Sequence, residues 1–315
     1  MTGPVSPRGE VRPQATLVVV AFHRPLELAR LLASTADPRV SLVVVDVEAD
    51  EAVADVARRA GARLVTIEGN PGYASAVNAG AAVAGSDVVV FANDDLSCSA
   101  DAVVALARRS AESGGVAVPR VNDRGGRPVR TVQATLNLRS LVVEWLLLPD
   151  APPRVLAGRV RVEKWRTPSA PERIEAASAV MVAVPAWLLR EEPLPERYGM
   201  YFEESEWFVR LARREVPVEY RPEIVVTHLG GRAVISGAKQ ALLARNAVRC
   251  LRALYGSRTA ALGWPIVVAW HARLVAVAAL HRAFGRGHAR VRGHELLNAR
   301  RAGLSAALRA WREVR

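Results

Sequence analysis

The chain has 315 residues, of which 50% are hydrophobic, and this is enough to bury a substantial core in one domain plus an extension. Its two cysteines, Cys98 and Cys250, are too few for a disulfide framework and match no metal-binding spacing. Its formal net charge is +12, and the distribution of this charge along the chain indicates which part could bind an anionic partner. Residues 1–14 contain no apolar segment of signal-peptide type, and we expect a disordered N-terminus and a cytoplasmic protein.

Two short apolar runs, residues 16–21 (TLVVVA) and 41–45 (SLVVV), are typical of strands buried on both faces. Each is followed by a helix-like stretch, residues 25–34 and 51–60. This alternation predicts a parallel α/β sheet. The second strand ends in Asp46, whose carboxylate either accepts a hydrogen bond from a nucleobase or ribose or caps the next helix.

Residues 69–80, GNPGYASAVNAG, are rich in small side chains that let the backbone approach a ligand closely. The segment has neither the Gly-Lys-Ser/Thr of a phosphate-binding Walker loop nor the GxGxxG dinucleotide pattern. It therefore indicates a ligand contact without matching either of these phosphate motifs.

Residues 88–96, VVVFANDDL, form an apolar run that ends in Asn93, Asp94 and Asp95. Ligands bind at the carboxyl ends of strands in open α/β sheets. Because two adjacent carboxylates repel each other unless a cation lies beside them, Asp94 and Asp95 predict a divalent metal held with diphosphate oxygens. The competing interpretation is an ordinary turn, in which Asn and Asp are common.

Two further motifs lie in the second half of the chain. Residues 200–214, MYFEESEWFVRLARR, carry Glu203 and Glu204 after an aromatic run, in a position where acids also stabilise a helix N-terminus. Residues 225–232, VVTHLGGR, place His228 between a β-branched run and two glycines. An imidazole there is a suitable third metal ligand beside carboxylate and diphosphate oxygens, although a lone histidine is more often structural.

These motifs together resemble glycosyltransferase family 2, the inverting GT-A enzymes, over roughly residues 15–255. The resemblance implies a GT-A fold, an α/β Rossmann-like nucleotide-binding domain whose mostly parallel sheet has helices on both faces. Residues 256–315 would then form a helical C-terminal extension. Where the family often carries Asp-x-Asp, this chain has Asn93 in the first place, and where the acidic motif usually has Asp, it has Glu204.

The resemblance also implies roles for individual residues. Asp95 and His228 would bind Mn²⁺ or Mg²⁺, and Glu204 or Glu203 would remove a proton from the acceptor hydroxyl. The donor would contact residues that follow three strands or lie on the basic segment downstream, namely Asp46, Asn70, Tyr73, Asn78, Asn93, Asp94, Arg232 and Arg245. Trp145, Trp165 and Trp187 either stack on sugar faces or lie in the core.

The implied activity is metal-dependent, inverting transfer of a sugar from a nucleoside-diphosphate sugar to an acceptor hydroxyl. The glycine-rich segment looks most like rhamnosyl- and galactofuranosyltransferases of bacterial envelope assembly, which favours a dTDP-rhamnose or UDP-sugar donor and includes a lipid-linked glycan among the acceptors. The alternative is a non-catalytic nucleotide-sugar-binding or membrane-associated scaffold of the same fold. A nucleic-acid partner is disfavoured because no nucleic-acid motif accompanies the basic charge.

The positive charge is concentrated at the C-terminal end. Residues 239–315 contain 15 Lys or Arg against two acids, a net +13, which leaves about −1 for the rest of the chain. Within this part, residues 261–284 are strongly apolar but interrupted by histidine and arginine. The pattern predicts a helix at the interface of an anionic membrane, with Trp264 and Trp270 near the headgroups. A helix packed on the catalytic domain or in a homodimer is the competing interpretation.

Overall fold

The computed structural model describes residues 14–148, 162–230, 236–284 and 288–314, so the predicted disordered N-terminus lies almost wholly outside the described residues. The chain divides into two compact units. Unit 1 comprises residues 1–133, 166–199 and 210–231, and unit 2 comprises residues 134–165, 200–209 and 232–315.

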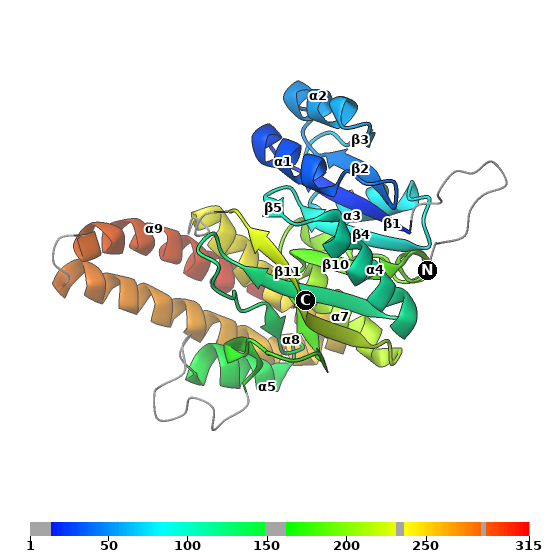
Figure 1. The fold of residues 1–315 in the computed structure, drawn as a ribbon. Helices are drawn as coiled ribbons and strands as arrows, with labels where there is room; N and C mark the ends of the chain where they lie inside the picture. Colours follow the sequence, from blue (N-terminus) through cyan, green and yellow to red (C-terminus); the bar gives the residue numbers. More distant parts are fainter. Residues whose placement is uncertain (1–13, 149–161, 231–235, 285–287, 315) are drawn as a thin grey trace. The chain divides into compact units, whose positions relative to one another are not determined.

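Unit 1 contains a nine-stranded sheet in the order β3-β2-β1-β4-β10-β6-β11-β5, with β8 paired to β11 (Figure 1). The four neighbouring strands β3, β2, β1 and β4 are parallel to one another. Strand β10 runs antiparallel to both β4 and β6. The strand bounds are β1 Ala15–Ala21, β2 Val40–Asp46, β3 Arg63–Thr66, β4 Val88–Asn93, β5 Leu96–Ser97, β6 Val116–Asn122, β8 Glu172–Arg173, β10 Met181–Pro185 and β11 Val218–His228. A separate two-stranded sheet pairs β7 (Val132–Gln133) with β9 (Ala176–Ala177).

The predicted α/β fold is confirmed, with a central sheet that is mostly parallel in its N-terminal half and has helices around it. The two apolar runs at the start form β1 and β2, and all seven residues of β1 are buried. The helices of unit 1 are α1 Pro25–Thr35, α2 Glu51–Arg59, α3 Tyr73–Ala82, α4 Ala100–Ser113 and α6 Ala186–Glu191, with the 3₁₀ turn η3 at Glu196–Tyr198.

The two faces of β1 are covered by different helices, because successive side chains of a strand point to opposite sides. Leu17 and Val19 belong to the core cluster that includes the buried leucines of α1 and the apolar residues of α2 and α4. Val18 faces α3, where a Cβ on Gly80 would lie only 2.3 Å from Val18 Cγ1 and 2.9 Å from Val45 Cγ2. A glycine at position 80 therefore lets α3 lie directly on β1 and β2.

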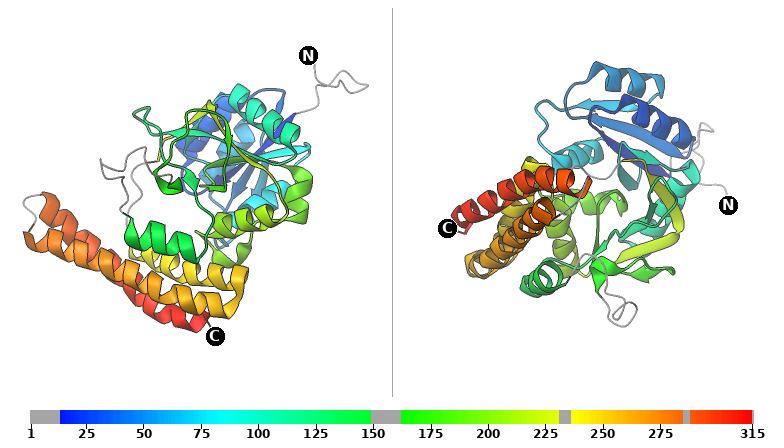
Figure 2. Two further views of the ribbon diagram at one scale, coloured as in Figure 1. Left: turned by 90° about the horizontal axis from the view of Figure 1, so that it is seen from below. Right: turned by 90° about the vertical axis from the view of Figure 1, so that its left-hand side faces the viewer.

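Unit 2 is helical. It contains α5 (Leu138–Ser140), which continues into the π-helix η1 (Leu141–Leu147), then α8 (Gly237–Phe284), α9 (His288–Arg309) and the 3₁₀ turn η4 (Ala310–Glu313). Residues 203–209 of α7 (Glu203–Arg213) also belong to it. Gly256, with φ 84°, breaks α8 into two helices, and α8 and α9 lie side by side (Figure 2).

The tryptophans of α8 pack inside unit 2. The indole N–H of Trp264 donates to the carbonyl of Ala307 at 2.8 Å, and the ring of Trp270 lies 4.8 Å from that of Trp145. The face that α8 leaves exposed is formed by other apolar side chains, Leu262, Val277, Leu280 and Phe284. By length and composition α8 is the one described helix suited to crossing a membrane, with a mean hydropathy of 1.5 in its most apolar window.

Candidate active site

Unit 1 brings three of the predicted polar strand ends to one edge of the sheet. Strand β11 is parallel to β6, and β10 is antiparallel to both β6 and β4, so β11 and β4 point the same way as β2. The carboxyl ends of these strands therefore carry Asp46, the Asn93–Asp95 segment and His228 at one edge. This is the edge at which open α/β sheets bind ligands.

Asp95 and His228 form a buried pair at this edge. Asp95 is 5% exposed, and its Oδ1 lies 3.0 Å from His228 Nε2. The short strand β5 produces this contact, because Leu96 pairs with His228 in register and the Leu229 N–H donates to the Asp95 carbonyl at 2.7 Å. The second carboxylate oxygen of Asp95 is paired with Arg24. Arg24 was not predicted from the sequence.

The charges around Asp95 and Asp94 differ in their effect. Burial acts to raise the pKa of Asp95, but the hydrogen bond and charge of His228 and the charge of Arg24 lower it below the ordinary value. For Asp94, burial dominates and raises the pKa to about 6, against the Phe22 N–H that donates to Asp94 Oδ2 at 2.9 Å. Asp95 is therefore the residue that is held as an anion.

The Asp95–His228 pair suits a divalent metal that is bound together with a substrate. A carboxylate and an imidazole are both ligands of Mn²⁺, and such ions are often held by one or two side chains plus phosphate oxygens and water. Within the described residues no group of three or more His, Cys, Asp or Glu side chains is placed to hold a metal without such help. The donor set fits a jointly bound ion.

Gly230 lies against this pair and was also missed by sequence reasoning. A Cβ at this position would lie 2.5 Å from Asp95 Oδ2 and 2.9 Å from His228 Nε2, distances that side-chain carbons do not adopt. The Gly-Gly pair after His228 in the sequence was the available indication, although turn formation explains such glycines equally well. The structure gives Gly230 a close-approach role.

Asp46 does not cap the following helix, which corrects one of the two sequence interpretations. Asp50 is the N-cap of α2, and its Oδ1 accepts the Ala52 N–H at 2.9 Å. Asp46 is 1% exposed and accepts the Glu48 N–H at 3.1 Å, so it closes the turn after β2. Its carboxylate has remaining acceptor capacity for a ligand group.

The glycine-rich segment is held by the chain between Leu194 and Gly199. The amide of Asn78 donates to the Leu194 carbonyl at 2.9 Å and to Glu196 Oε1 at 2.8 Å, and its oxygen accepts the Leu194 N–H at 3.0 Å. The Tyr73 hydroxyl donates to the Ala179 carbonyl at 2.9 Å. Both side chains thus have internal partners in unit 1, and their predicted donor contacts stay predictions.

Two residues of this segment have unusual backbone conformations. Gly72 has φ 110°, and a Cβ there would lie 1.8 Å from the Gly199 carbonyl oxygen, which accepts the Tyr73 N–H at 2.9 Å. Asn70 has φ 43°, and its N–H donates to the Val47 carbonyl at 3.0 Å. The turn before α3 is therefore fixed to β2 on one side and to the end of η3 on the other.

The two predicted bases begin α7 in unit 2. Glu203 is 5% exposed, and the Oε2 atoms of Glu203 and Glu204 are buried without a hydrogen-bond partner among the described residues. Burial raises the pKa of both carboxyl groups, and the neighbouring Glu204 charge raises that of Glu203 further. Such groups accept a proton more readily than exposed glutamates do.

The turn that precedes these glutamates is strained and supported. Tyr201 and Phe202 have φ 69° and 78°, a region that non-glycine residues rarely adopt. The fully buried Asn246 donates from its amide nitrogen to the Met200 carbonyl at 2.9 Å and to the Tyr201 carbonyl at 3.1 Å. The Lys239 ammonium lies 5.2 Å from the centre of the Tyr201 ring. Asn246 and Tyr201 were not predicted as site residues.

The remaining predicted residues have mixed outcomes. Arg245 lies on α8 in unit 2. Trp145 packs between the rings of Phe202 and Trp270, whereas Trp187 is 43% exposed. Arg232 and the side chain of Trp165 lie outside the described part of the structure.

Comparison with known proteins supports the sequence resemblance. Residues 16–163, somewhat under half of the chain, match the model of the family described as glycosyl transferase family 2. No curated protein sequence matches the chain. A mannosyltransferase from Pyrobaculum calidifontis, solved with GDP-Man and Mn²⁺, is 15% identical, and the match covers 95% of this chain and 89% of that one with a TM-score of 0.50.

Two mycobacterial structures are similar as well. Glucosyl-3-phosphoglycerate synthase from Mycobacterium tuberculosis, solved with Mn²⁺, UDP and glucosyl-3-phosphoglycerate, is 18% identical, with 78% of this chain and 80% of that one covered and a TM-score of 0.50. A structure described as a mycobacterial protein is 18% identical, with coverages of 78% and 76% and a TM-score of 0.51. At these identities the likeness concerns the fold, so the chain has the GT-A fold and matches glycosyl transferase family 2 over residues 16–163.

Proposed function

We propose that the protein is a glycosyltransferase that moves a sugar from a nucleoside-diphosphate sugar to an acceptor hydroxyl, with inversion at the anomeric carbon. The observation that carries the proposal is the buried Asp95–His228 pair, with 3.0 Å between carboxylate oxygen and imidazole nitrogen, at the carboxyl ends of the strands. The family match over residues 16–163 supports it. The other structural feature that supports it lies at the start of α7, where the buried Oε2 atoms of Glu203 and Glu204 have no hydrogen-bond partner among the described residues.

In this proposal unit 1 binds the donor. Asp95 and His228 would hold Mn²⁺ or Mg²⁺, and the ion would supply positive charge that stabilises the departing diphosphate. Asp46 accepts a hydrogen bond from the base or ribose, and Asn93 and Asp94 face the ribose or the sugar. Asn70, Tyr73 and Asn78 form the wall of the donor site, and Arg232 and Arg245 pair with the diphosphate.

Glu204 or Glu203 acts as the general base. The acceptor oxygen attacks the anomeric carbon and forms the new glycosidic bond, its proton passes to the carboxylate, and the bond to the diphosphate oxygen breaks with its electron pair. In its ionised form, a buried carboxylate with a raised pKa is suited to this step because its affinity for the proton is higher than that of an exposed glutamate. The raised pKa of both residues leaves either of them in the role.

The donor is proposed to be a dTDP-rhamnose or UDP-sugar, and the acceptor a hydroxyl of an envelope polysaccharide or lipid-linked glycan. The support for this choice is the resemblance of residues 69–80 to rhamnosyl- and galactofuranosyltransferases. One similar structure carries UDP and another GDP-Man, so guanosine diphosphate belongs among the candidates to be tested.

Peripheral attachment to the cytoplasmic face of an anionic membrane is part of the proposal. It is supported by the exposed apolar face of α8, where Leu262 is 63%, Leu280 55% and Phe284 81% exposed. Exposed apolar side chains beside basic residues are typical of helices that lie at a membrane interface. A second copy of the chain on the same face is the competing partner.

The proposed function is tested by donor binding and donor turnover. UDP, dTDP and GDP are titrated into the protein with and without Mn²⁺, and hydrolysis of the matching sugar donor is followed. We expect one nucleotide to bind more tightly with metal in the parent and the metal effect to disappear in Asp95→Ala, while folding by circular dichroism is unchanged. Nucleotide binding without transfer to any hydroxyl acceptor would favour the scaffold alternative, and metal-independent binding identical in both proteins would contradict the role of Asp95.

A further inference from the structure

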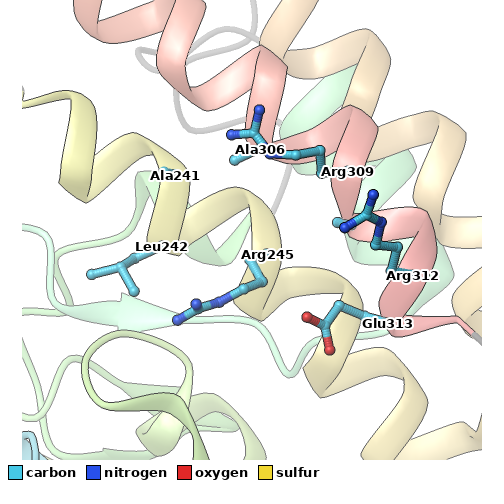
Figure 3. Close-up of a pocket in the computed structure, with 8 residues that line it drawn as sticks. Ala241, Leu242, Arg245, Ala306, Arg309, Arg312 and Glu313 are labelled. Atoms are coloured by element: carbon cyan, nitrogen blue, oxygen red, sulfur yellow. The ribbon is translucent and has the colours of Figure 1, made fainter.

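A pocket of about 280 Å³ lies in unit 2 between α8 and the end of the chain formed by α9 and η4. Three arginines line it, Arg245 from α8, Arg309 from α9 and Arg312 from η4 (Figure 3). Its apolar lining comes from one leucine and three alanines, namely Leu242, Ala241, Ala306 and Ala310. The volume is near the lower end of the range of small-molecule sites, about 300 to 1,000 Å³.

The charge of this pocket is not balanced by its own residues. Its three arginines and one glutamate, Glu313, give a net charge of +2. The Glu313 carboxylate is already engaged, because its Oε2 lies 2.8 Å from Nε of Arg249. Within the described part of the chain Arg245, Arg309 and Arg312 make no ion pair, and Arg309 donates only to the Ser305 hydroxyl at 2.6 Å.

Arg245 is the arginine whose position is least favourable in the absence of an anion. It is half-buried, and burial followed by the charge of Arg249 lowers its pKa, although the charge of Glu313 acts in the opposite direction. Among the described residues, its one hydrogen bond to a side chain is a long contact of 3.4 Å from Nε to Asn246 Oδ1. An anionic group in the pocket would supply the missing acceptor and compensate the burial of the guanidinium.

We infer that this pocket binds a phosphate group carried by an ester substituent, with Arg245, Arg309 and Arg312 around the phosphate and Leu242 and the alanines against the substituent. Guanidinium groups are suited to phosphate because their N–H groups match its oxygens in pairs. The phosphate comes from a membrane phospholipid headgroup or from a soluble ester such as a nucleotide. The inference does not depend on glycosyl transfer, and it assigns Arg245 to this pocket in place of the donor diphosphate.

The test compares Arg309→Gln/Arg312→Gln with the parent and with Arg301→Gln. Arg309, Arg312 and Arg301 are all exposed, so none of the substitutions opens the core, and Arg301 lies on α9 without lining the pocket. One arm measures binding of pyrophosphate and UDP by calorimetry without added Mn²⁺, so that binding at the proposed metal-dependent donor site is minimised. A second arm measures co-sedimentation with phosphatidylcholine vesicles with and without phosphatidylglycerol. A third arm measures donor turnover separately in all three proteins.

Charge-assisted hydrogen bonds are worth about 1.5 kcal/mol or more, so we expect affinity to fall about tenfold for each arginine removed and Arg301→Gln to bind as the parent does. Loss confined to the vesicle arm identifies a lipid phosphate, and loss in the calorimetric arm identifies a soluble phosphate ester. The inference is wrong if the parent binds neither probe, if the double variant binds as the parent does, or if Arg301→Gln weakens binding equally. If the proteins turn over donor but bind no phosphate in the pocket, the inference about the pocket is wrong and the proposed glycosyl transfer is unaffected.

Discussion

Gly230 is the residue whose side chain, a single hydrogen, leaves room for the contact between Asp95 and His228. We predict that Gly230→Ala weakens metal-dependent nucleotide binding about tenfold, an energy of about 1.4 kcal/mol, because the new methyl group would lie 2.5 Å from Asp95 Oδ2 and push the Asp95 and His228 side chains apart. Calorimetric titration of nucleotide with Mn²⁺ measures the effect.

Gly85→Ala is the matched control, because Gly85 has an ordinary φ and its Cβ would meet no atom within 4 Å. Both variants should unfold cooperatively, which thermal denaturation checks. A Gly230→Ala protein that binds nucleotide and metal as Gly85→Ala does would show that the spacing of Asp95 and His228 is unimportant.

Glu204 is the next residue whose role can be isolated. Removing a positioned base costs about 10²- to 10⁴-fold in rate, so we predict that Glu204→Gln binds donor normally and loses turnover to that extent. Glu203→Gln is made in parallel, and Glu68→Gln, an exposed residue of unit 1, serves as the control. Normal rates in both buried variants would exclude the acidic segment from catalysis, whereas loss in Glu203→Gln alone would assign the base one residue earlier.

The same glutamates give a pH dependence of stability with a defined sign. Their pKa values in the folded protein are raised from an ordinary value of 4.5, so the folded chain keeps protons that the unfolded chain has released. The stabilising contribution is therefore complete below pH 4.5 and decreases as the pH rises above it. Denaturation by urea should accordingly show a smaller decrease with pH in Glu203→Gln than in the parent.

At the scale of single residues, the sequence predicted the strand ends that carry polar side chains but not the partners of those side chains. The strand that ends in Asp94 and Asp95 is visible as an apolar run followed by acids. The contact between Asp95 and His228 joins residues far apart in the chain and requires the pairing of Leu96 with His228 in two strands, one of which has only two residues. Such a strand is too short to leave a periodic pattern in the sequence. Arg24 and Gly230 reach Asp95 from distant parts of the chain, so no local pattern predicts their contacts either.

At the scale of elements, a buried histidine of α8 lies where α8 and α9 pack together. His271 is fully buried, and neither ring nitrogen has a partner among the described residues. A Cβ on Gly303 of α9 would lie 2.6 Å from His271 Nδ1, so the two helices approach closely at this point. Burial, followed by the charge of Arg300, lowers the pKa of His271 to about 4.

This lowered pKa predicts loss of stability in mild acid. Below pH 6.5 the unfolded chain takes up a proton on His271, whereas the folded chain does so only near pH 4, so stability is complete above pH 6.5 and decreases below it. We compare the free energies of unfolding of His271→Leu and the parent at two pH values. We predict that lowering the pH from 7.5 to 5 shifts the difference between them by on the order of 2 kcal/mol in favour of His271→Leu. Urea denaturation at the two pH values measures this, with the exposed His281→Leu as control. Parallel pH profiles for His271→Leu and the parent would contradict the prediction.

The elements of unit 1 were predicted more accurately than those of unit 2. The first two strands and helices lie within one or two residues of the predicted limits, because continuous apolar runs and helix-length intervals are local patterns. The antiparallel insertion of β10 between β4 and β6 was not foreseen, since pairing order depends on contacts between distant segments. In unit 2, one of two interpretations placed Trp264 and Trp270 near the lipid headgroups, whereas in the structure they pack against α9 and Trp145.

For the whole molecule, the exposed face of α8 gives a prediction about location. We predict that Leu280→Ser/Phe284→Ser reduces binding to vesicles containing phosphatidylglycerol while leaving the melting temperature within about 1 °C, because both side chains are more than half exposed. Co-sedimentation at low and high salt measures the binding. Equal vesicle binding by parent and variant would exclude this face, and a change from dimer to monomer by light scattering would assign the face to a second copy of the chain.

The division of the chain at residue 256 and the assignment of the site residues stay predictions at this scale. Unit 2 is assembled from three stretches of sequence, and residues 200–209 lie between two stretches of unit 1. No local pattern marks where a chain leaves one compact unit and enters another, because the boundaries are set by contacts among distant segments. The composition of residues 239–315 predicted a basic helical segment, and in the structure α8 and α9 form helices there.

The close approach of α3 to the sheet has a consequence for how this sequence can evolve. Gly80 has no space for a methyl group because Val18 and Val45 occupy it, at 2.3 and 2.9 Å from where a Cβ would be. In relatives of this protein, alanine at position 80 should therefore be accompanied by a smaller residue at position 18 or by a shifted α3. Positions 18, 45 and 80 are therefore expected to covary among relatives, so that a change at one accompanies a change at another.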